Sequence, residues 1–413
     1  MIDSRDVACR ILIVGAGPTG TTTALALKKY VPDIQVTLID KASFPGDKAC
    51  GDGLGPGVRR MLELLGLVGL LHGFNRPISV AVTGPAGLEA TARGSLIGKK
   101  DLSGFVAPRL DFDNRLVDEC IRQGIVVHTE ERFRDLQGMA NGQIRVISEH
   151  LPSSEMRTGT YDLVVAADGA YSAVRRVIKA PVAKKSETYI AMRSYASISH
   201  PSEVVAETLR LDFIDAFLPA YGWMFPVSSG RANIGVGLPV SQLRNGDQNL
   251  RQLLDRYYEE LRRWGFEVGP AELTKTHHLP HAASRLRMVY GHVVFLGDAA
   301  ATIKPMSGEG IFYGMAAGVQ LAQQLSQVLR GSDVNWVREL KLFERAYKRR
   351  FRMHFMSCYF IHVMFKSRRW TNMIVRSAAK NRDVMATGAF IMFDEGSITP
   401  GLIVHAIGRR LNS

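Results

Sequence analysis

The chain has 413 residues, of which 46% are hydrophobic and 22% charged, a composition typical of a soluble globular protein with a large core. No apolar run reaches the roughly 18 residues that a membrane-spanning helix needs, and the acid-containing start Met1–Asp6 does not resemble a signal peptide, so we expect a cytoplasmic protein. The net charge of +13 is concentrated between Arg338 and Arg382, where thirteen Lys and Arg against two acids give +11, and no nucleic-acid-binding motif accompanies this segment.

Residues 9–40 predict a β-α-β unit. A strand at Arg10–Val14 enters a glycine turn, a helix spans Thr21–Lys29, and a second strand spans Gln35–Ile39. The turn satisfies Gly-x-Gly-x-x-Gly, in which the first glycine allows the tight turn, the second admits a diphosphate and the third allows close helix–strand packing. Asp40 ends the second strand and is placed to accept hydrogen bonds from a ribose. The predicted dinucleotide contacts are Gly15, Gly17, Pro18, Thr19, Gly20, Asp40 and Lys41.

The middle of the chain mixes glycine-rich loops with short periodic segments. Residues 41–57 contain five glycines and two prolines and are expected to form a loop. The elements expected next are a helix at Arg59–Leu71, strands and turns at Pro77–Val106, a helix at Arg109–Gln123, and strands at Ile125–His128, Arg132–Ser148 and Thr160–Ala166.

Residues 187–240 differ from what precedes them. Their alternating β-branched and aromatic residues, with glycine turns, predict an antiparallel sheet that forms a second domain. A helix at 248–265 then leads back to a strand at Val293–Leu296 and a helix at Gly310–Leu329. From Trp336 to about Arg382 the pattern predicts amphipathic, basic helices.

Three later motifs distinguish FAD from a nicotinamide dinucleotide. They are Ala167-Asp168-Gly169 followed by Arg175, Gly297-Asp298-Ala299-Ala300, and Pro305-Met-Ser-Gly308-Glu-Gly310-Ile311. In this order and spacing they resemble the glutathione-reductase-type FAD superfamily, in the single-Rossmann branch that includes the aromatic hydroxylases. The resemblance implies that Asp298 contacts the ribityl chain, that amides of the third motif approach the flavin pyrimidine edge, and that Arg109 lies near the cofactor. A helix N-terminus at that edge would stabilise the reduced, anionic ring.

The resemblance implies an α/β fold with a Rossmann-like FAD-binding domain, an antiparallel β-sheet substrate domain and a C-terminal helical region. The expected boundaries are 1–75, 108–180 and 289–330 for the FAD-binding domain, 76–107 for an excursion into the sheet domain, 181–288 for the substrate domain and 331–413 for the basic helical region. Because the chain has no second Gly-x-Gly-x-x-Gly unit, NADH or NADPH acting as a transient reductant would have to use the flavin cleft.

Within this superfamily, roughly residues 9–330 resemble the geranylgeranyl reductase family. The resemblance is carried by the loop Asp40–Gly53 with its Cys50-Gly51, by Tyr221-Gly-Trp223-Met-Phe-Pro226 with Asn233-Ile-Gly-Val-Gly, by His278-Leu-Pro280 and by the Gly-Asp motif. Relatives commonly have a basic residue where this chain has Gly46, and Asp52 is either a substrate-binding acid or a turn cap. The implied FAD contacts beyond the N-terminal unit are Cys50, Gly51, Arg109, Asp168, Gly169, Gly297, Asp298, Pro305, Gly308, Gly310 and Ile311.

This family uses reduced FAD to hydrogenate isolated carbon–carbon double bonds of polyprenyl chains, which implies a reductase acting on a polyprenyl or other lipophilic substrate. Flavin N5 would supply hydride, and because such an alkene is unactivated, a proton donor must cooperate. Cys50 and Tyr221 are the candidate donors, and either could instead be a packing residue. Trp223 is the third catalytic candidate, in an apolar wall with Phe225, although we expect at least one of these two rings to pack in the core.

Two other classes of function stay open. A flavin monooxygenase or halogenase of the same fold is the main alternative, although Tyr221 stands where the halogenase motif Trp-x-Trp-x-Ile-Pro has its first Trp. A non-catalytic flavoprotein would use the basic C-terminus for docking, and that region fits a solvated face, a membrane surface or an acidic carrier protein equally well. No metal site is expected, since His277, His278 and His281 have no nearby acid or cysteine to complete a set. No oligomeric state is predicted.

Overall fold

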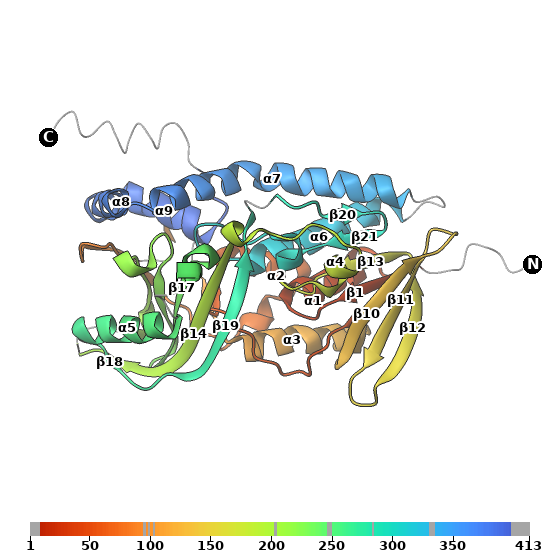
Figure 1. Cartoon of the computed structure of the whole chain (residues 1–413), viewed down its shortest axis with the longest axis horizontal. Coiled ribbons are helices and arrows are strands. Elements are labelled where there is room, and N and C mark those ends of the chain that lie inside the picture. Colours follow the sequence, from red (N-terminus) through yellow and green to blue (C-terminus); the bar gives the residue numbers. More distant parts are fainter. Residues whose placement is uncertain are drawn as a thin grey trace, which may run out of the picture.

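The computed structural model describes residues 9–93, 96–97, 100–101, 104–201, 205–245, 250–282, 285–329 and 335–397. Residues 1–8, for which no signal peptide is predicted, lie outside these ranges. The end of the predicted C-terminal helical region, from residue 398, also lies outside them. Two β-sheets flank a shared cavity, and one long helix, α7 (Trp336–Met364), extends along one edge of the molecule over both (Figure 1). The fold is the predicted α/β type, with a Rossmann-like unit, a largely antiparallel sheet and C-terminal helices.

The first sheet carries the N-terminal glycine turn. In spatial order its strands are β20 (Val289–Tyr290), β21 (Val293–Phe295), β13 (Leu163–Ala166), β1 (Arg10–Val14), β2 (Gln35–Ile39) and β9 (Val126–His128). All neighbours are parallel except β20 and β21. Because β2 and β13 lie on opposite sides of β1, the crevice beyond the carboxyl end of β1 is a topological switch point, where open α/β sheets bind ligands.

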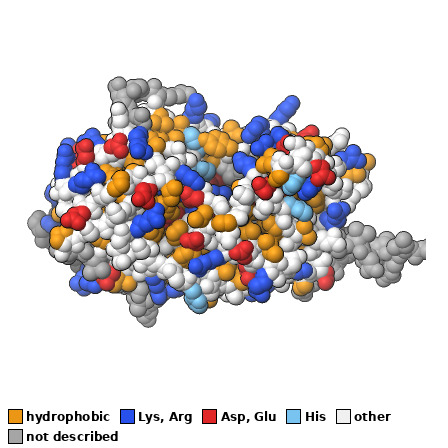
Figure 2. Space-filling model, turned by 90° about the horizontal axis from the view of Figure 1, so that it is seen from below, with side chains coloured by type: hydrophobic (Ala, Val, Ile, Leu, Met, Phe, Trp, Pro, Cys, Tyr) orange, Lys and Arg blue, Asp and Glu red, His pale blue; other side chains and the backbone are white. Residues whose placement is uncertain are grey.

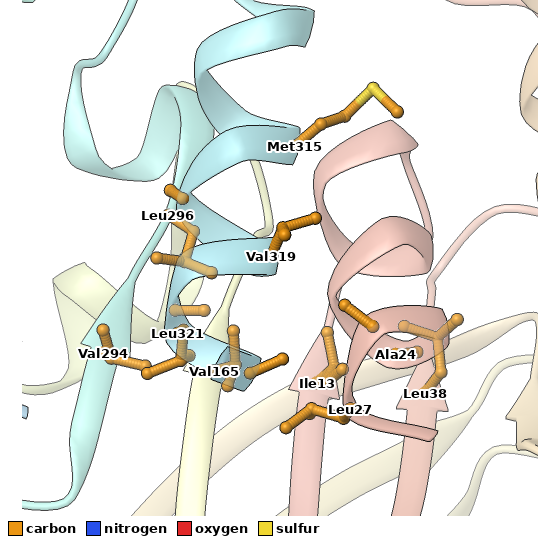
Figure 3. Packing of buried hydrophobic residues seen from close by; sticks show 14 of the residues in the cluster. Ile13, Ala24, Leu27, Leu38, Val165, Val294, Leu296, Met315, Val319 and Leu321 are labelled. Carbon is orange, nitrogen blue, oxygen red and sulfur yellow. The ribbon is translucent and has the colours of Figure 1, made fainter. Parts of the chain in front are cut away.

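Helices α1 (Pro18–Tyr30) and α6 (Ile311–Val328) pack together on this sheet (Figure 3). Their close approach depends on two glycines of α6, Gly314 and Gly318, which face Thr19 and Thr23 of α1. A Cβ at Gly318 would lie 2.1 Å from the Thr23 Oγ1, well inside van der Waals contact. The glycines therefore bring the N-termini of both helices to the same edge of the sheet.

The Gly318→Ala variant is expected to lower the free energy of unfolding by about 1–3 kcal/mol, because the added methyl group overpacks the α1–α6 contact. Gly388→Ala is the matched control, since Gly388 also lies within a helix but a Cβ there meets nothing within 4 Å. That control should stabilise the protein by about 0.5–1 kcal/mol, as helix propensity alone predicts. Urea denaturation of both variants measures the difference, and a stabilising Gly318→Ala would contradict the packing argument.

The second sheet is larger and mostly antiparallel. In spatial order its strands are β18 (Glu267–Val268), β14 (Thr188–Ser199), β17 (Arg231–Pro239), β16 (Gly222–Ser228), β15 (Thr208–Asp212), β4 (Ser79–Thr83) and β5 (Glu89–Arg93), with β19 (Glu272–Pro280) paired to β14. Helix α5 (Leu250–Arg263) covers one face through an apolar cluster that includes Met224 and Ile234. The opposite face is turned to the cavity, so residues that alternate along β16 have different surroundings.

Smaller elements complete the fold. They are the antiparallel sheet β10 (Glu131–Gly138), β11 (Ile144–His150) and β12 (Glu155–Tyr161), the strand pairs β3 (Gly53–Leu54) with β8 (Phe105–Val106) and β6 (Leu96–Ile97) with β7 (Lys100–Asp101), and the helices α2 (Pro56–Leu65), α3 (Arg109–Arg122), α4 (Ala173–Val177), α8 (Arg368–Lys380) and α9 (Arg382–Phe393). Acidic and basic side chains are mixed on the face shown in Figure 2. No helix within the described ranges is long and apolar enough to cross a membrane.

Three expected elements differ in detail from the observed ones. The expected helix Arg59–Leu71 is α2 followed by a separate 3₁₀ turn, because Gly66 adopts a left-handed conformation (φ 78°) and ends the helix. The expected strand Thr160–Ala166 is the end of β12 plus all of β13, which belong to different sheets. The large sheet is not wholly antiparallel, because β4 and β15, which lie far apart in the sequence, pair in parallel.

Candidate active site

A cavity of about 900 Å³ lies between the two sheets, within the range of pockets that bind small molecules and cofactors. The predicted site residues that line it are Gly15, Gly17, Pro18, Thr19, Asp40, Lys41, Cys50, Gly51, Arg109, Asp168, Gly169, Tyr221, Trp223, Asp298, Pro305, Gly308, Gly310 and Ile311. Gly20 and Gly297 are not among the lining residues. A Cβ at Gly20 would lie 1.8 Å from the Gly15 carbonyl oxygen and one at Gly297 would lie 2.6 Å from the Thr19 Oγ1, so both serve close packing behind the cavity wall.

The glycine turn after β1 forms one end of the cavity. Gly15 has φ 106°, and a Cβ there would lie 2.3 Å from the Ala167 carbonyl oxygen. Gly17 caps the N-terminus of α1 without any side-chain hydrogen bond, so the first amides of the helix keep their capacity to bind an anion. Lys48 approaches the same turn, with its Nζ 3.3 Å from the position of a Gly17 Cβ.

Asp40 is held in place by the backbone around it. Its Oδ2 accepts a hydrogen bond from the Ala16 amide (2.7 Å) and its Oδ1 accepts one from the Ala42 amide (2.9 Å). The Lys48 Nζ lies 4.0 Å from the same carboxylate. These contacts fix the carboxylate at the carboxyl end of β2 and leave lone pairs for a ligand hydroxyl.

Two acids lie farther along the cavity wall. Asp168 accepts a hydrogen bond from the Val174 amide through Oδ2 (3.1 Å), while its buried Oδ1 has no hydrogen-bond partner within the described ranges. Burial raises the pKa of Asp168. Asp298 does not cap the short helix that contains it, and instead its Oδ2 lies 3.5 Å from the His277 Nε2. Both positions offer carboxylate oxygens to a polar ligand.

The loop from Pro305 to Gly310 leads into α6. Gly308 has φ 68°, and a Cβ at Gly310 would lie 3.1 Å from the Asp298 Oδ1. The loop is fixed from the large sheet by the Tyr221 hydroxyl, which donates to the Ser307 carbonyl oxygen at 2.5 Å. The predicted flavin-edge motif and the predicted aromatic motif are therefore in direct contact.

Cys50 lines the cavity from the turn before β3. Its Sγ accepts a hydrogen bond from the Asp52 amide at 3.4 Å. Burial raises the pKa of the thiol, and the neighbouring Arg109 guanidinium acts in the opposite direction. Arg109 is itself buried and held by Asp113 through two hydrogen bonds of 2.6 Å. The thiol is therefore protonated near neutral pH, next to a fixed positive charge.

The aromatic wall comes from alternate residues of β16 and its approach. Tyr221, Trp223 and Phe225 all line the cavity. The expectation that at least one of Trp223 and Phe225 packs in the core is confirmed for Trp223, which is buried in an apolar cluster and also borders the cavity. Because residues two apart on a strand share a face, both rings lie on the cavity side of β16, and Met224 enters the other core, beneath α5. The Trp223 Nε1 donates to the Asn233 Oδ1 at 3.0 Å, which fixes the indole.

Sequence reasoning missed the ion cluster that holds the Cys50 loop. The Asp47 carboxylate pairs with the Arg193 guanidinium (2.5 Å) and the Lys275 ammonium (3.0 Å), and these contacts lower its pKa against the effect of burial. Arg193 lies on β14 and Lys275 on β19, so no local pattern connects them to the loop. Lys48 was also missed, and it supplies a positive charge near the glycine turn, two positions after Gly46.

The C-terminal helix α9 also contributes to the cavity wall, through Ala389, Met392 and Phe393. Its end is attached to the flavin-edge loop by Lys304, a fully buried residue whose Nζ lies 2.8 Å from the Glu309 Oε2 and donates to the Met392 carbonyl oxygen at 2.7 Å. Apart from a lysine and a glutamate in a glycine-rich turn, no sequence pattern predicts this contact.

The Lys304→Met variant is expected to lower the free energy of unfolding by about 3–5 kcal/mol, because it leaves the buried Glu309 carboxylate without its cation. Adding Glu309→Gln should restore a large part of that loss. Lys348→Met is the control, since Lys348 pairs with Glu344 on the half-exposed face of α7 and should contribute less than about 1 kcal/mol. If urea denaturation showed equal losses of the free energy of unfolding for Lys304→Met and Lys348→Met, the buried Lys304–Glu309 pair would not be the contact that holds the loop.

Known proteins are similar to this chain in sequence. Residues 8–340 match the FAD binding domain family. The chain is 33% identical over 333 residues to a menaquinone reductase of Mycobacterium tuberculosis, covering 78% of this chain and 77% of that protein. It is 24% identical over 355 residues to a digeranylgeranylglycerophospholipid reductase of Thermoplasma acidophilum, with 83% of each chain covered.

Solved structures share the fold. A geranylgeranyl bacteriochlorophyll reductase-like protein from Thermoplasma acidophilum superimposes with a TM-score of 0.78 at 20% identity, over 97% of this chain and 99% of that one. A triple mutant of a flavin-dependent brominase gives a TM-score of 0.74 at 16% identity, over 98% and 99% of the two chains. Since reductases and halogenases both adopt this architecture, the fold alone does not select the reaction.

Proposed function

The chain belongs to the geranylgeranyl reductase family of FAD-dependent oxidoreductases, and on that premise we propose that it reduces carbon–carbon double bonds of a polyprenyl or other lipophilic substrate. The relatives with the higher identity are menaquinone reductases, so a polyprenyl quinone is the first substrate to test. The observation that carries the proposal is the meeting of a protonated thiol, a fixed guanidinium and an aromatic wall at one side of a nucleotide-type cavity.

The residues present fit FAD. Gly17 presents no side chain where the turn borders the cavity, and the amides at the start of α1 are open to a diphosphate. We propose that Asp40 accepts the adenosine ribose hydroxyls and that Asp298 contacts the ribityl chain. The buried Asp168 Oδ1, which has no partner within the described part of the chain, would gain one from the cofactor or its bound water. The remaining predicted contacts are proposed for the same cofactor.

The substrate side of the cavity suits an apolar chain. Leu209 and Leu211 from β15, Trp223 from β16, and Met392 and Phe393 from the end of α9 line it. Leu211, Trp223 and Met392 are buried in one apolar cluster, against which Phe393 packs, and this gives a wall that excludes water. A polyprenyl chain laid against this wall would be held by non-directional contacts, while its reacting bond faces the Cys50 turn.

We propose Cys50 as the proton donor. When bound and reduced, FAD would supply the hydride that one carbon of the double bond receives. The Cys50 S–H bond breaks and its proton forms a C–H bond at the other carbon, so the alkene gains two hydrogen atoms. Arg109 then stabilises the thiolate until solvent returns a proton to it. A thiol whose pKa is raised by burial remains protonated for the next turnover.

Tyr221 has a different part in this scheme. Its single hydroxyl proton is donated to the Ser307 carbonyl oxygen, so the hydroxyl holds the flavin-edge loop in place. Burial raises the pKa of Tyr221, which keeps the phenol neutral. We propose that the Tyr221 contact and the Trp223 indole shape the chamber, and that the proton comes from the thiol.

Tyr221→Phe is therefore expected to keep its FAD and to lose about 3- to 10-fold in reduction rate, the cost of one hydrogen bond. Single-turnover kinetics of the reduced protein with a polyprenyl substrate measure it. A loss of about 100-fold or more, with the loop intact, would move the donor role from Cys50 to Tyr221.

We propose that the protein acts at the cytoplasmic side of a membrane, because lipophilic substrates reside in membranes. The basic helices α7 and α8 would contact either anionic lipid or an acidic carrier protein that presents the substrate. NADH or NADPH, if either is the reductant, would reach the flavin from the open cleft. Flavin-dependent oxygenation or halogenation is the second candidate, and it rests on the architecture shared with the brominase.

The reaction class is tested by anaerobic reoxidation of the dithionite-reduced protein. A geranylgeranyl lipid without a quinone ring should reoxidise the flavin, and its fully saturated counterpart should not. A saturated-chain quinone controls for reduction of the ring itself. If neither lipid reoxidised the flavin under anaerobic conditions, and reoxidation occurred only once oxygen was admitted, the proposal would be contradicted and the oxygenase class favoured.

A further inference from the structure

Asp52 lies directly behind the Cys50 turn and does not line the cavity. It is fully buried and has a left-handed backbone conformation, with φ 61°. Aspartate and asparagine tolerate this region better than other residues with a side chain. The Asp52 carbonyl oxygen accepts a hydrogen bond from the Ala107 amide (2.9 Å), next to the β3–β8 pairing. A charged group is thus built into a strained turn two residues from the proposed proton donor.

The Asp52 carboxylate is the centre of a buried polar network. Its Oδ2 accepts hydrogen bonds from the Tyr195 hydroxyl (2.6 Å) and from the Asn233 Nδ2 (2.8 Å). The same Asn233 Nδ2 donates to the Cys50 carbonyl oxygen at 2.8 Å, and the Asn233 Oδ1 accepts from the Trp223 indole. One amide therefore couples the carboxylate to the turn that presents the thiol and to the aromatic wall.

The charge of Asp52 is also felt by the thiol. The titratable groups that face the carboxylate are Cys50, Tyr195, Arg193 and Arg109. Burial raises the pKa of Asp52 to about 6, against the opposing effects of its two hydrogen bonds and the two arginines. Above that pH the carboxylate is ionised, and its negative charge raises the pKa of Cys50.

We propose that Asp52 is a positioning residue that keeps Cys50 protonated and, through Asn233, holds the thiol turn against the substrate chamber. The inference rests on the proposed role of Cys50 as proton donor. It explains why an acid occupies a glycine-rich turn at an unfavourable backbone angle. It also explains why the Asn233 amide, which the reaction itself does not use, is committed to three buried partners.

The test is the pH dependence of Cys50 alkylation by iodoacetamide in the FAD-loaded protein, followed on the Cys50 peptide by mass spectrometry. In Asp52→Asn the carboxylate charge is absent while the backbone angle remains accessible. The alkylation profile is therefore expected to shift to lower pH by about one unit. Asp212→Asn is the matched control, since Asp212 is also fully buried and also accepts from a tyrosine hydroxyl (2.5 Å, Tyr257), but on the core side of β15.

A second variant keeps the test valid if Asp52→Asn folds poorly. Tyr195→Phe removes one donor that disperses the carboxylate charge, while the carboxylate stays ionised at the pH where Cys50 titrates, so the Cys50 profile should shift by a smaller amount in the opposite direction, to higher pH. Profiles that coincide with the unaltered protein in both variants would overturn the proposal, as would an equal shift in Asp212→Asn.

The same variants separate this inference from the proposed function. If Cys50 is the donor, the alkaline limb of the single-turnover reduction rate should move in step with the alkylation profile, to lower pH in Asp52→Asn and to higher pH in Tyr195→Phe. If the alkylation profile shifts and the rate profile does not, the electrostatic coupling of Asp52 to Cys50 stands and the donor role of Cys50 fails.

Discussion

Cys50→Ala is expected to slow double-bond reduction by about 10²- to 10⁴-fold, the usual contribution of a positioned general acid. Flavin should be retained, because alanine keeps the backbone of the turn that is proposed to contact the cofactor, and the Arg109–Asp113 pair beside it remains intact. Single-turnover oxidation of the dithionite-reduced variant by a polyprenyl substrate measures the loss. Cys50→Ser should recover little, since a hydroxyl is a much weaker acid than a thiol.

Cys9→Ala is the matched control for Cys50→Ala. Cys9 is the other half-buried cysteine, and it precedes β1 at the end of the sheet away from the cavity. It should retain the rate of the unaltered protein. A Cys50→Ala variant that reduces substrate as fast as Cys9→Ala would remove the thiol from the reaction and leave Tyr221 as the remaining candidate donor.

Gly15→Ala is expected to abolish FAD retention and to lower the free energy of unfolding by about 3 kcal/mol or more. Its Cβ would lie 2.3 Å from a backbone oxygen, and φ 106° is unfavourable for any residue with a side chain. The strand–turn–helix connection must therefore move, and the amides at the start of α1 move with it. The flavin absorbance of the purified protein and urea denaturation report the two effects.

Gly66→Ala separates backbone strain from steric conflict. Gly66 also has a positive φ (78°), but a Cβ there meets nothing within 4 Å. The Gly66→Ala variant should lose only about 1 kcal/mol of its free energy of unfolding and should retain FAD fully. If Gly15→Ala behaved like Gly66→Ala, the turn after β1 would not be the diphosphate-binding element.

The parts that sequence predicted well are local ones. The strand, turn and helix around Gly15 and the short strand before Asp40 depend on residues that are close in the chain, and the observed β1 and β2 have the expected bounds. Periodic apolar segments likewise predicted α3, α5 and α6 to within a few residues. In these elements local propensity and burial favour the same structure.

The parts that sequence did not predict depend on distant residues. The network of Asp52 joins Tyr195 and Asn233, which are 143 and 181 positions away. Lys304 reaches the end of α9 across 88 positions. Neither contact leaves a periodic signal, because its partners come from elements that are far apart in the chain. The parallel pairing of β4 with β15 was missed for the same reason, since only the folded sheet brings them together.

The most direct test of the central claim is mass spectrometry of the product. The FAD-loaded protein, reduced with dithionite under anaerobic conditions, is incubated with menaquinone, and the quinone ring is then reoxidised in air so that only the side chain reports the reaction. The account predicts a product that carries two additional hydrogen atoms for each double bond reduced, and a Cys50→Ala sample in which this product is nearly absent. A substrate recovered with unchanged mass, together with an oxygenated or halogenated product in aerobic incubations, would contradict it.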